Sequence, residues 1–164
     1  MEDDNGGMKM EIIQNSILNP PSDERIIKIE NYSHVKFPTA FIEFIKKSNG
    51  GIPVTNKFIL SQNECVVERF LCILDNPKES ELGDYDISVV LTQLDERLTD
   101  NGELIGDELI PFGALFGGDF VCLDYTVSQE PTICIWYHEE SEELAPVIEK
   151  IADNINEFFE MLSE

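Results

Sequence analysis

The segment from Phe37 to Gly51 constrains the fold most, because both ends of a helix can be read in it. Pro38 suits the first helical position, where its missing N–H has no intrahelical partner to lose. At the other end, Asn49-Gly50-Gly51 tolerates the left-handed conformation of a C-cap. The apolar residues of the segment recur at helical spacing and share one face: Phe37, Phe41, Phe44 and Ile45. We therefore expect a helix that ends near Ser48 and lays this face on a core.

The rest of the chain alternates helical and strand-like patterns. Helical spacing predicts further helices over about residues 9–18, 22–32, 87–98 and 151–162. Apolar runs bounded by turn residues predict strands over 52–60, 65–74, 119–125 and 133–138, and a further apolar segment covers 109–113. Closely spaced strands without helices between them imply antiparallel pairing. The sequence therefore predicts an α+β fold, an antiparallel sheet with helices at the N- and C-terminal ends and one inserted helix.

A length of 164 residues suits one domain with one core. Residues 1–8 are acidic and Gly-rich, so we expect a disordered leader there, with Met8 as an alternative start, and a single domain over residues 9–164. The leader lacks the basic and then apolar pattern of a signal peptide. No run reaches the roughly 18 apolar residues of a membrane span. We expect a cytoplasmic protein with no membrane partner.

The charge balance is strongly acidic and uneven. Eleven basic residues face 33 acidic ones, which gives a formal net charge of −22. Residues 1–74 carry net −2, whereas residues 75–164 carry net −20. Binding to a phosphate backbone needs Lys and Arg to displace counterions, so this composition argues against nucleic acid as a partner. A charged partner should be basic, although solubility alone explains the acidity equally well.

The sequence contains no recognisable catalytic, cofactor-binding or metal-binding motif. The acidic run from His138 to Glu143 lacks the ligand spacing and the Gly of a calcium loop. A solvated loop, a site for a basic partner and a metal site stay open for this run, in that order. The four cysteines lack zinc-site spacing and lie in apolar strands, which predicts reduced core residues. Neither histidine accompanies a nucleophile motif, so we expect no enzyme and no cofactor.

Several short motifs follow one another along residues 24–162. They are Phe37-Pro38 with Asn49-Gly50-Gly51, Ile110-Pro111-Phe112, Gly118-Asp119, Ile135-Trp136-Tyr137-His138-Glu139 and Ile155-Asn156-Glu157-Phe158-Phe159. In this order they resemble the SUKH superfamily, which includes a fungal cell-wall synthesis regulator and many bacterial immunity proteins. Phe37 departs from the leucine that is common there, and the acidic connection over residues 78–86 matches no family motif. The resemblance implies an α+β fold without an active site, in which these motif residues are structural: Pro38, Asn49, Gly50, Gly51, Gly118, Asp119 and Trp136.

For a bacterial chain, the resemblance implies an immunity protein that binds and blocks a cognate toxin, often a nuclease domain of a secreted polymorphic toxin. A nuclease presents Lys and Arg to phosphates, so an acidic protein can compete for the same surface. The leading hypothesis is therefore stoichiometric neutralisation of a basic toxin domain. The alternative is an intracellular regulatory interaction module without a toxin partner. The expected rim contacts are Asp84, Asp86, Asp107, Glu108, Glu139, Glu140, Glu142 and Glu143.

Overall fold

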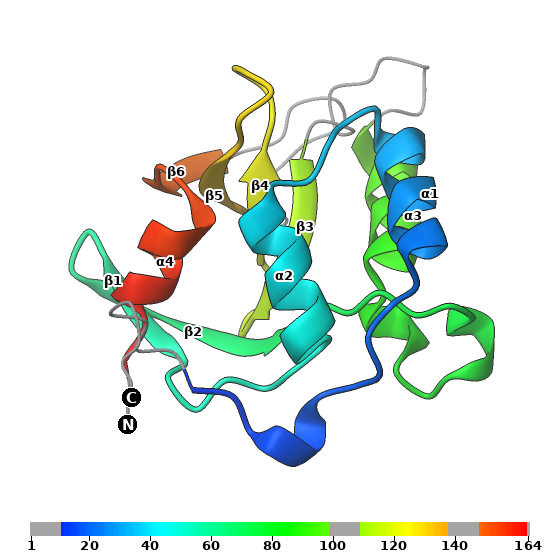
Figure 1. Ribbon diagram of the computed structural model, residues 1–164. Coiled ribbons are helices and arrows are strands. Elements are labelled where there is room, and N and C mark those ends of the chain that lie inside the picture. The colour runs from blue at the N-terminus through cyan, green and yellow to red at the C-terminus, as the bar shows by residue number, and fades with distance from the viewer. Residues whose placement is uncertain (1–10, 99–108, 138–147, 164) are drawn as a thin grey trace.

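The computed structural model describes residues 11–98, 109–137 and 148–163. These residues form one antiparallel sheet whose strands follow one another in the order β1-β2-β3-β4-β5-β6 (Figure 1). The strands are β1 (Lys57–Leu60), β2 (Asn63–Phe70), β3 (Leu109–Leu115), β4 (Phe120–Asp124), β5 (Thr132–Trp136) and β6 (Ile148–Ala152). The α-helices are α1 (Asp23–Ser33), α2 (Thr39–Ser48), α3 (Ile87–Leu98) and α4 (Ile155–Met161), with short 3₁₀ helices η1 (Gln14–Ser16), η2 (Pro77–Glu79) and η3 (Gly83–Tyr85). The predicted fold class is confirmed, because helices precede and follow the sheet and α3 is inserted between β2 and β3.

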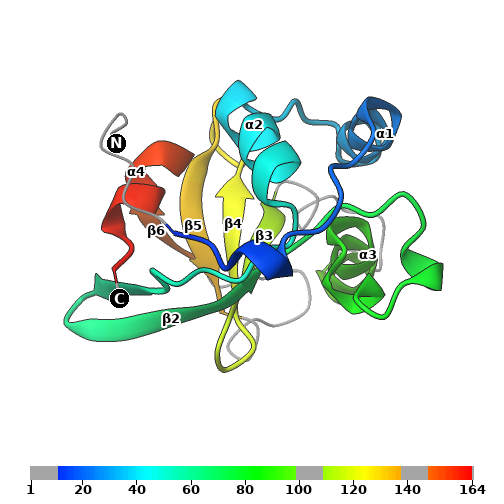
Figure 2. The same ribbon diagram turned by 60° about the horizontal axis from the view of Figure 1, so that its bottom comes forward.

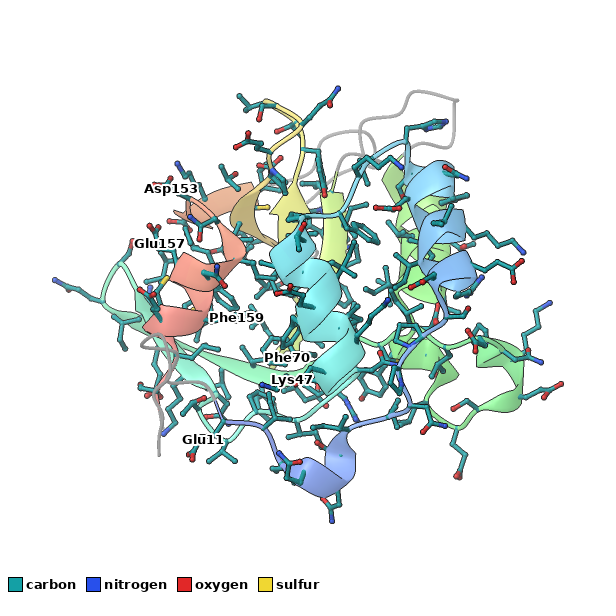
Figure 3. All side chains as sticks on the ribbon, viewed as in Figure 1. Glu11, Lys47, Phe70, Asp153, Glu157 and Phe159 are labelled. Atoms are coloured by element: carbon teal, nitrogen blue, oxygen red, sulfur yellow. The ribbon has the colours of Figure 1, made fainter. Side chains whose placement is uncertain are left out.

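Helices α2 and α4 lie side by side over one face of the sheet (Figures 1 and 2). Helices α1 and α3 stand together beyond β3, and the β1–β2 hairpin extends away from them. Aromatic rings join the two covering helices to the sheet. The ring centroid of Phe44 lies 4.9 Å from that of Phe70 and 4.7 Å from that of Phe159. Figure 3 shows Phe159 between α4 and α2, so the core lies between these helices and the strands.

The helix expected from Pro38 is α2, which begins one residue later, with Pro38 as its N-cap. Its predicted apolar face is buried, as expected. At its other end, Asn49 has a φ of −52°, and Gly50 takes the left-handed conformation with a φ of 68°. A Cβ at Gly50 would also lie 2.8 Å from the Cβ of Cys72. Glycine is therefore needed at this C-cap for its conformation and for space.

The prediction of a helix over residues 9–18 was wrong for residues 11–18, the part that the structure describes. Residues 11–18 hold an isolated bridge between Ile12 and Pro53 and then the single turn η1. Backbone hydrogen bonds join this segment to the chain after α2: Val54 N–H donates to Glu11 O at 2.7 Å, and Ile13 N–H donates to Ile52 O at 2.9 Å. These long-range bonds satisfy the backbone groups that a local helix would otherwise use.

The closing helix predicted over residues 151–162 was wrong in its first part. Ile151 belongs to β6, which pairs antiparallel with β5 and places Ile148 opposite Trp136. Helix α4 starts only at Ile155, where Asn154 Oδ1 accepts a hydrogen bond from Glu157 N–H at 2.9 Å. The Glu157 carboxylate returns to accept from Asp153 N–H at 2.9 Å, and both side chains lie at the start of α4 in Figure 3. These two hydrogen bonds together fix the start of the helix and separate it from the strand.

The remaining predicted elements are present, with different bounds: β3, for example, extends two residues beyond the 109–113 segment. The helix predicted over residues 22–32 is α1, which Ser22 caps: its Oγ accepts from Arg25 N–H at 3.1 Å. The predicted helix over residues 87–98 is α3, and the strands predicted over 52–60 and 65–74 are the shorter β1 and β2. Ser61 and Gln62 take positive φ in the turn between them. The predicted leader, residues 1–8, lies outside the described residues.

Candidate partner-binding surface

The structure tests the position of only two of the expected rim acids. Asp84 lies in η3 and is exposed to solvent. Asp86 immediately precedes α3 and is 0% exposed. The others lie outside the described residues: Asp107, Glu108, Glu139, Glu140, Glu142 and Glu143.

The expectation that Asp86 contacts a partner at the rim is corrected by its burial. One carboxylate oxygen accepts from Leu74 N–H at 2.7 Å, and the other accepts from Ser88 N–H at 2.8 Å and Val89 N–H at 3.2 Å. The guanidinium of Arg25 lies 3.8 Å from the same carboxylate. Asp86 therefore caps α3 and holds the segment after β2, and its charge is used inside the fold. An Asp directly before a predicted helix was the sequence signal for this role.

Asp84 belongs instead to a pocket that the sequence did not predict. The pocket has a volume of about 180 Å³ and is formed by β2, η3, β3 and the β3–β4 turn. Its acidic lining residues are Glu68, Asp84 and Asp119. Its apolar lining residues are Leu71, Ala114, Leu115 and Phe120. The pocket therefore combines an apolar wall with carboxylates from three separate segments.

The nearby cation Arg69 is held by the fold itself. Its Nε and Nη2 donate to Gly50 O at 3.2 and 2.6 Å. Its guanidinium carbon lies 5.2 Å from the ring centroid of Tyr85, which also lines the pocket. Within the described part of the chain, the side chains of Glu68 and Asp84 form no hydrogen bond or ion pair. Two of the three carboxylates are thus available to an incoming cation.

A second group of polar side chains comprises Tyr137 after β5, Glu149 in β6 and Cys65 in β2. Tyr137 Oη donates to Glu149 Oε1 at 2.7 Å. The pKa of Tyr137 is raised mainly by burial and, to a lesser extent, by this hydrogen bond. Burial, with the charges of Glu149 and Asp119, raises the pKa of the Cys65 thiol. A raised pKa keeps Cys65 a thiol at neutral pH, and a thiol is a poor nucleophile. Among the residues that the structure describes, no group of three or more potential ligands is arranged to hold a metal ion.

The motif residue Asn49 joins three segments from a fully buried position. Its Nδ2 donates to Asn19 O at 2.7 Å and to Ile73 O at 2.9 Å, and its Oδ1 accepts from Ile73 N–H at 2.8 Å. Every hydrogen-bonding group of the amide except one acceptor site is used. Asn49 thereby links the end of α2 to the segments before α1 and after β2.

The other motif residues occupy special backbone or core positions. A Cβ at Gly51 would lie 2.5 Å from Ile12 Cγ2, and Gly118 has a φ of 97° in the β3–β4 turn. Asp119 is partly exposed and lines the acidic pocket. Trp136 is 1% exposed, and its ring stacks on that of Phe120 with centroids 6.0 Å apart.

Sequence reasoning missed the pocket because its walls meet only in the folded sheet. Glu68 lies where the β2–β3 register shifts between Val67 and Arg69, and no residue pattern marks that bulge. Tyr85 lies in the acidic connection over residues 78–86, where the sequence predicts no helix or strand. The signal that could have been used was the neighbouring Asp84-Tyr85 in a connection that matches no family motif.

Within the described ranges, none of the helices has the length and apolar content needed to cross a membrane. No curated protein matches the chain. The model of the SUKH_6 family, described as SMI1-KNR4 cell-wall, matches residues 23–159. This match covers the chain from the start of α1 to α4, including α2, the sheet and the acidic pocket. The chain therefore belongs to the SUKH superfamily, in its SMI1-KNR4 group.

Proposed function

We propose that this protein is an immunity protein that neutralises a cognate toxin by stoichiometric binding, in the cytoplasm of a bacterial cell. The observation that carries the proposal is a net charge of −20 over residues 75–164 in a chain of this family. The SUKH superfamily supports a role in protein binding, as an immunity protein or a related regulator. The acidity favours a basic partner, and a nuclease domain is the toxin class that must expose Lys and Arg.

The physical basis is competition for a cationic groove. A field of one sign over much of the surface raises the rate of encounter with a basic domain, by roughly 10- to 1,000-fold at low salt. Charge alone does not give a long residence time, because exposed ion pairs are weak and screened by salt. Apolar anchors beside the acids must supply slow dissociation.

The first test is to identify a partner and to show that it kills. Tagged protein is used to capture proteins from an extract of its native cells, with washes at low and then high salt and identification by mass spectrometry. The proposal expects one basic partner whose domain is lethal when expressed alone and harmless when this protein is co-expressed. A captured set of host proteins with no lethal member would overturn the immunity proposal.

The acidic run after His138 provides a sharper test of steering. Reversing Glu139, Glu140, Glu142 and Glu143 to lysine should slow association at low salt by at least roughly tenfold and weaken its salt dependence. The matched control reverses four exposed glutamates of the nearly neutral part of the chain: Glu11, Glu24, Glu43 and Glu64. Both variants change the net charge equally, so only a local contact separates them. Equal association rates for the two variants would remove the run from the proposed interface.

The second candidate is a regulatory interaction module that binds a host protein. The SMI1-KNR4 cell-wall description of the matching family favours it. The same capture experiment distinguishes the two functions. A reproducible host partner that binds at high salt, together with no protection against any toxin, would support regulation.

A further inference from the structure

The acidic pocket opens on the sheet face that α2 and α4 leave uncovered. Arg69, Ala114, Phe120 and Trp136 are register partners on neighbouring strands, so their side chains share one face. Phe70 lies one residue along β2 and points to the opposite face, where its ring meets that of Phe44 in α2. Figure 2 shows α2 and α4 on one face of the sheet. Ala114 and Phe120 line the pocket, which therefore lies on the other face.

The size of the pocket suits one side chain rather than a small-molecule ligand. Its volume is about 180 Å³. Pockets that take cofactors or drug-sized ligands are larger, roughly 300–1,000 Å³. Its three carboxylates are not arranged with other groups as a metal site among the described residues. A single cationic side chain delivered by a protein partner is the occupant that fits both the volume and the charge.

The lining chemistry favours arginine over lysine. An arginine carries an apolar stem, which the wall formed by Leu71, Ala114 and Phe120 can cover. Its planar guanidinium can bond carboxylates with two parallel N–H groups and can stack on an aromatic ring. The fold already contains one such stacking contact, because the guanidinium of Arg69 lies over the ring of Tyr85. Even with Arg69 counted, the pocket and its wall carry a formal charge of −2.

An exposed aromatic side chain lies next to the pocket along the chain. Phe116 follows the lining residue Leu115 in the β3–β4 turn and is 65% exposed. The backbone fixes its position, because Phe116 N–H donates to Val66 O at 3.0 Å. An exposed phenylalanine beside a charged pocket has the composition of an interface centre, with an apolar anchor next to a specific polar contact.

We infer that this pocket receives an arginine side chain of the protein partner, with Glu68 and Asp84 as its ion-pairing groups and Phe116 as the neighbouring apolar anchor. The inference rests on the proposed function for the identity of the partner, a basic protein. Its contact residues are not members of the acidic run after His138. It also gives a structural role in recognition to the connection over residues 78–86, which has no counterpart among the family motifs.

The first experiment tests the pocket without the partner. The full chain is titrated with N-acetyl-arginine N-methylamide, and backbone amide shifts are followed by NMR. Saturable, millimolar binding should shift the amides of Tyr85, Gly118 and Phe120. The uncharged isostere N-acetyl-citrulline N-methylamide should not. Equal shifts with citrulline, or with the lysine analogue, would overturn the assignment to arginine.

Matched variants test whether the two free carboxylates hold the probe. Glu68→Gln with Asp84→Asn should weaken arginine binding roughly tenfold, the effect of losing charge-assisted contacts in a partly open site. The control, Glu130→Gln with Glu160→Gln, removes the same charge from exposed positions elsewhere and should leave binding unchanged. Both pocket acids are exposed, so neutralising them should preserve the fold, which the dispersion of the NMR spectrum verifies. Equal weakening in both pairs would show that the probe responds only to net charge.

The same variants separate failure of the pocket from failure of the proposed function. If Glu68→Gln with Asp84→Asn protects cells and binds the toxin as tightly as the natural chain, the pocket inference is overturned and the immunity proposal stands. If the pocket binds arginine but no captured partner kills cells, the site stands and the immunity proposal is overturned. Phe116→Ala should accelerate dissociation of the partner and leave the arginine probe unaffected, because the anchor contacts the partner and not the pocket.

Discussion

Replacing Asn49 by alanine tests whether one buried amide holds three separate segments together. The substitution leaves Ile73 N–H without its acceptor and Ile73 O without its side-chain donor. Asn19 O also loses a donor, but Asn19 is exposed and water can replace the bond. Each buried backbone group left unsatisfied costs about 1–3 kcal/mol. We expect Asn49→Ala to lower the free energy of unfolding by about 3 kcal/mol in total.

Urea unfolding of the purified chain, followed by circular dichroism, measures this loss directly. With a slope of about 2 kcal/mol per molar urea, the midpoint should fall by about 1.5 M without a change in slope. The melting temperature of a chain this size should fall by roughly 6–12 °C. Asn76→Ala is the control, because Asn76 is exposed and its side chain makes no capping hydrogen bond. It should change the free energy of unfolding by less than about 0.5 kcal/mol.

The isosteric variant Asn49→Asp separates hydrogen bonding from shape. It keeps the acceptor for Ile73 N–H but turns a carboxylate oxygen toward two carbonyl oxygens. Burial and these oxygens disfavour the charged form, so its pKa should rise in the folded state. Its loss of stability relative to the natural chain should therefore be smaller at pH 4 than at pH 7, because protonation restores a donor. A loss below about 1 kcal/mol in Asn49→Ala, or no pH dependence in Asn49→Asp, would refute this account of the junction.

Two further predictions concern buried groups. Asp86→Ala removes the cap of α3 and the acceptor of Leu74 N–H. Urea unfolding should therefore show a free energy of unfolding lower by about 3 kcal/mol. A decrease of less than about 1 kcal/mol would contradict the structural role of Asp86. Burial raises the pKa of Cys72 to about 12 and that of Cys122 well above its usual range, so neither thiol should react with iodoacetamide at pH 8 until the chain unfolds. The unfolded chain loses these protons near pH 9 while the folded chain keeps them, so stability should fall as the pH rises from 9 towards 12; rapid native labelling or stability that is constant over this range would contradict their burial.

The sequence was most informative where local chemistry and apolar spacing agree. Helix α2 combines a proline start, an apolar face and a glycine end, and it was predicted to within one residue. The helix predicted over residues 22–32 is α1, Asp23–Ser33, and its start is also set locally, by the Ser22 cap and the first turn. The spacing of Ile151 and Ile155 misled the prediction, since two apolar residues four apart also occur when a strand is followed directly by a helix. Periodicity cannot separate these cases without the pairing of β6 with β5.

The candidate site was less predictable than the fold. Net charge indicated a basic partner, but it could not show which carboxylates are exposed and which are structural. Asp84 and Asp86 are two residues apart and equally acidic, yet one faces the pocket and the other is enclosed by backbone N–H groups. Their difference arises from the way that the segment after β2 turns back on the start of α3.

The amino-acid sequence by itself determined the fold class, the position of α2 and its C-terminal glycine, and the concentration of acidity after residue 74. These depend on local conformational preference, on apolar spacing and on composition, all of which act along the chain. Only the tertiary structure decided that Glu68, Asp84 and Asp119 line one pocket and that Asn49 joins three segments. The physical reason is that these groups are far apart in sequence, and the register of the strands and long-range hydrogen bonds bring them together.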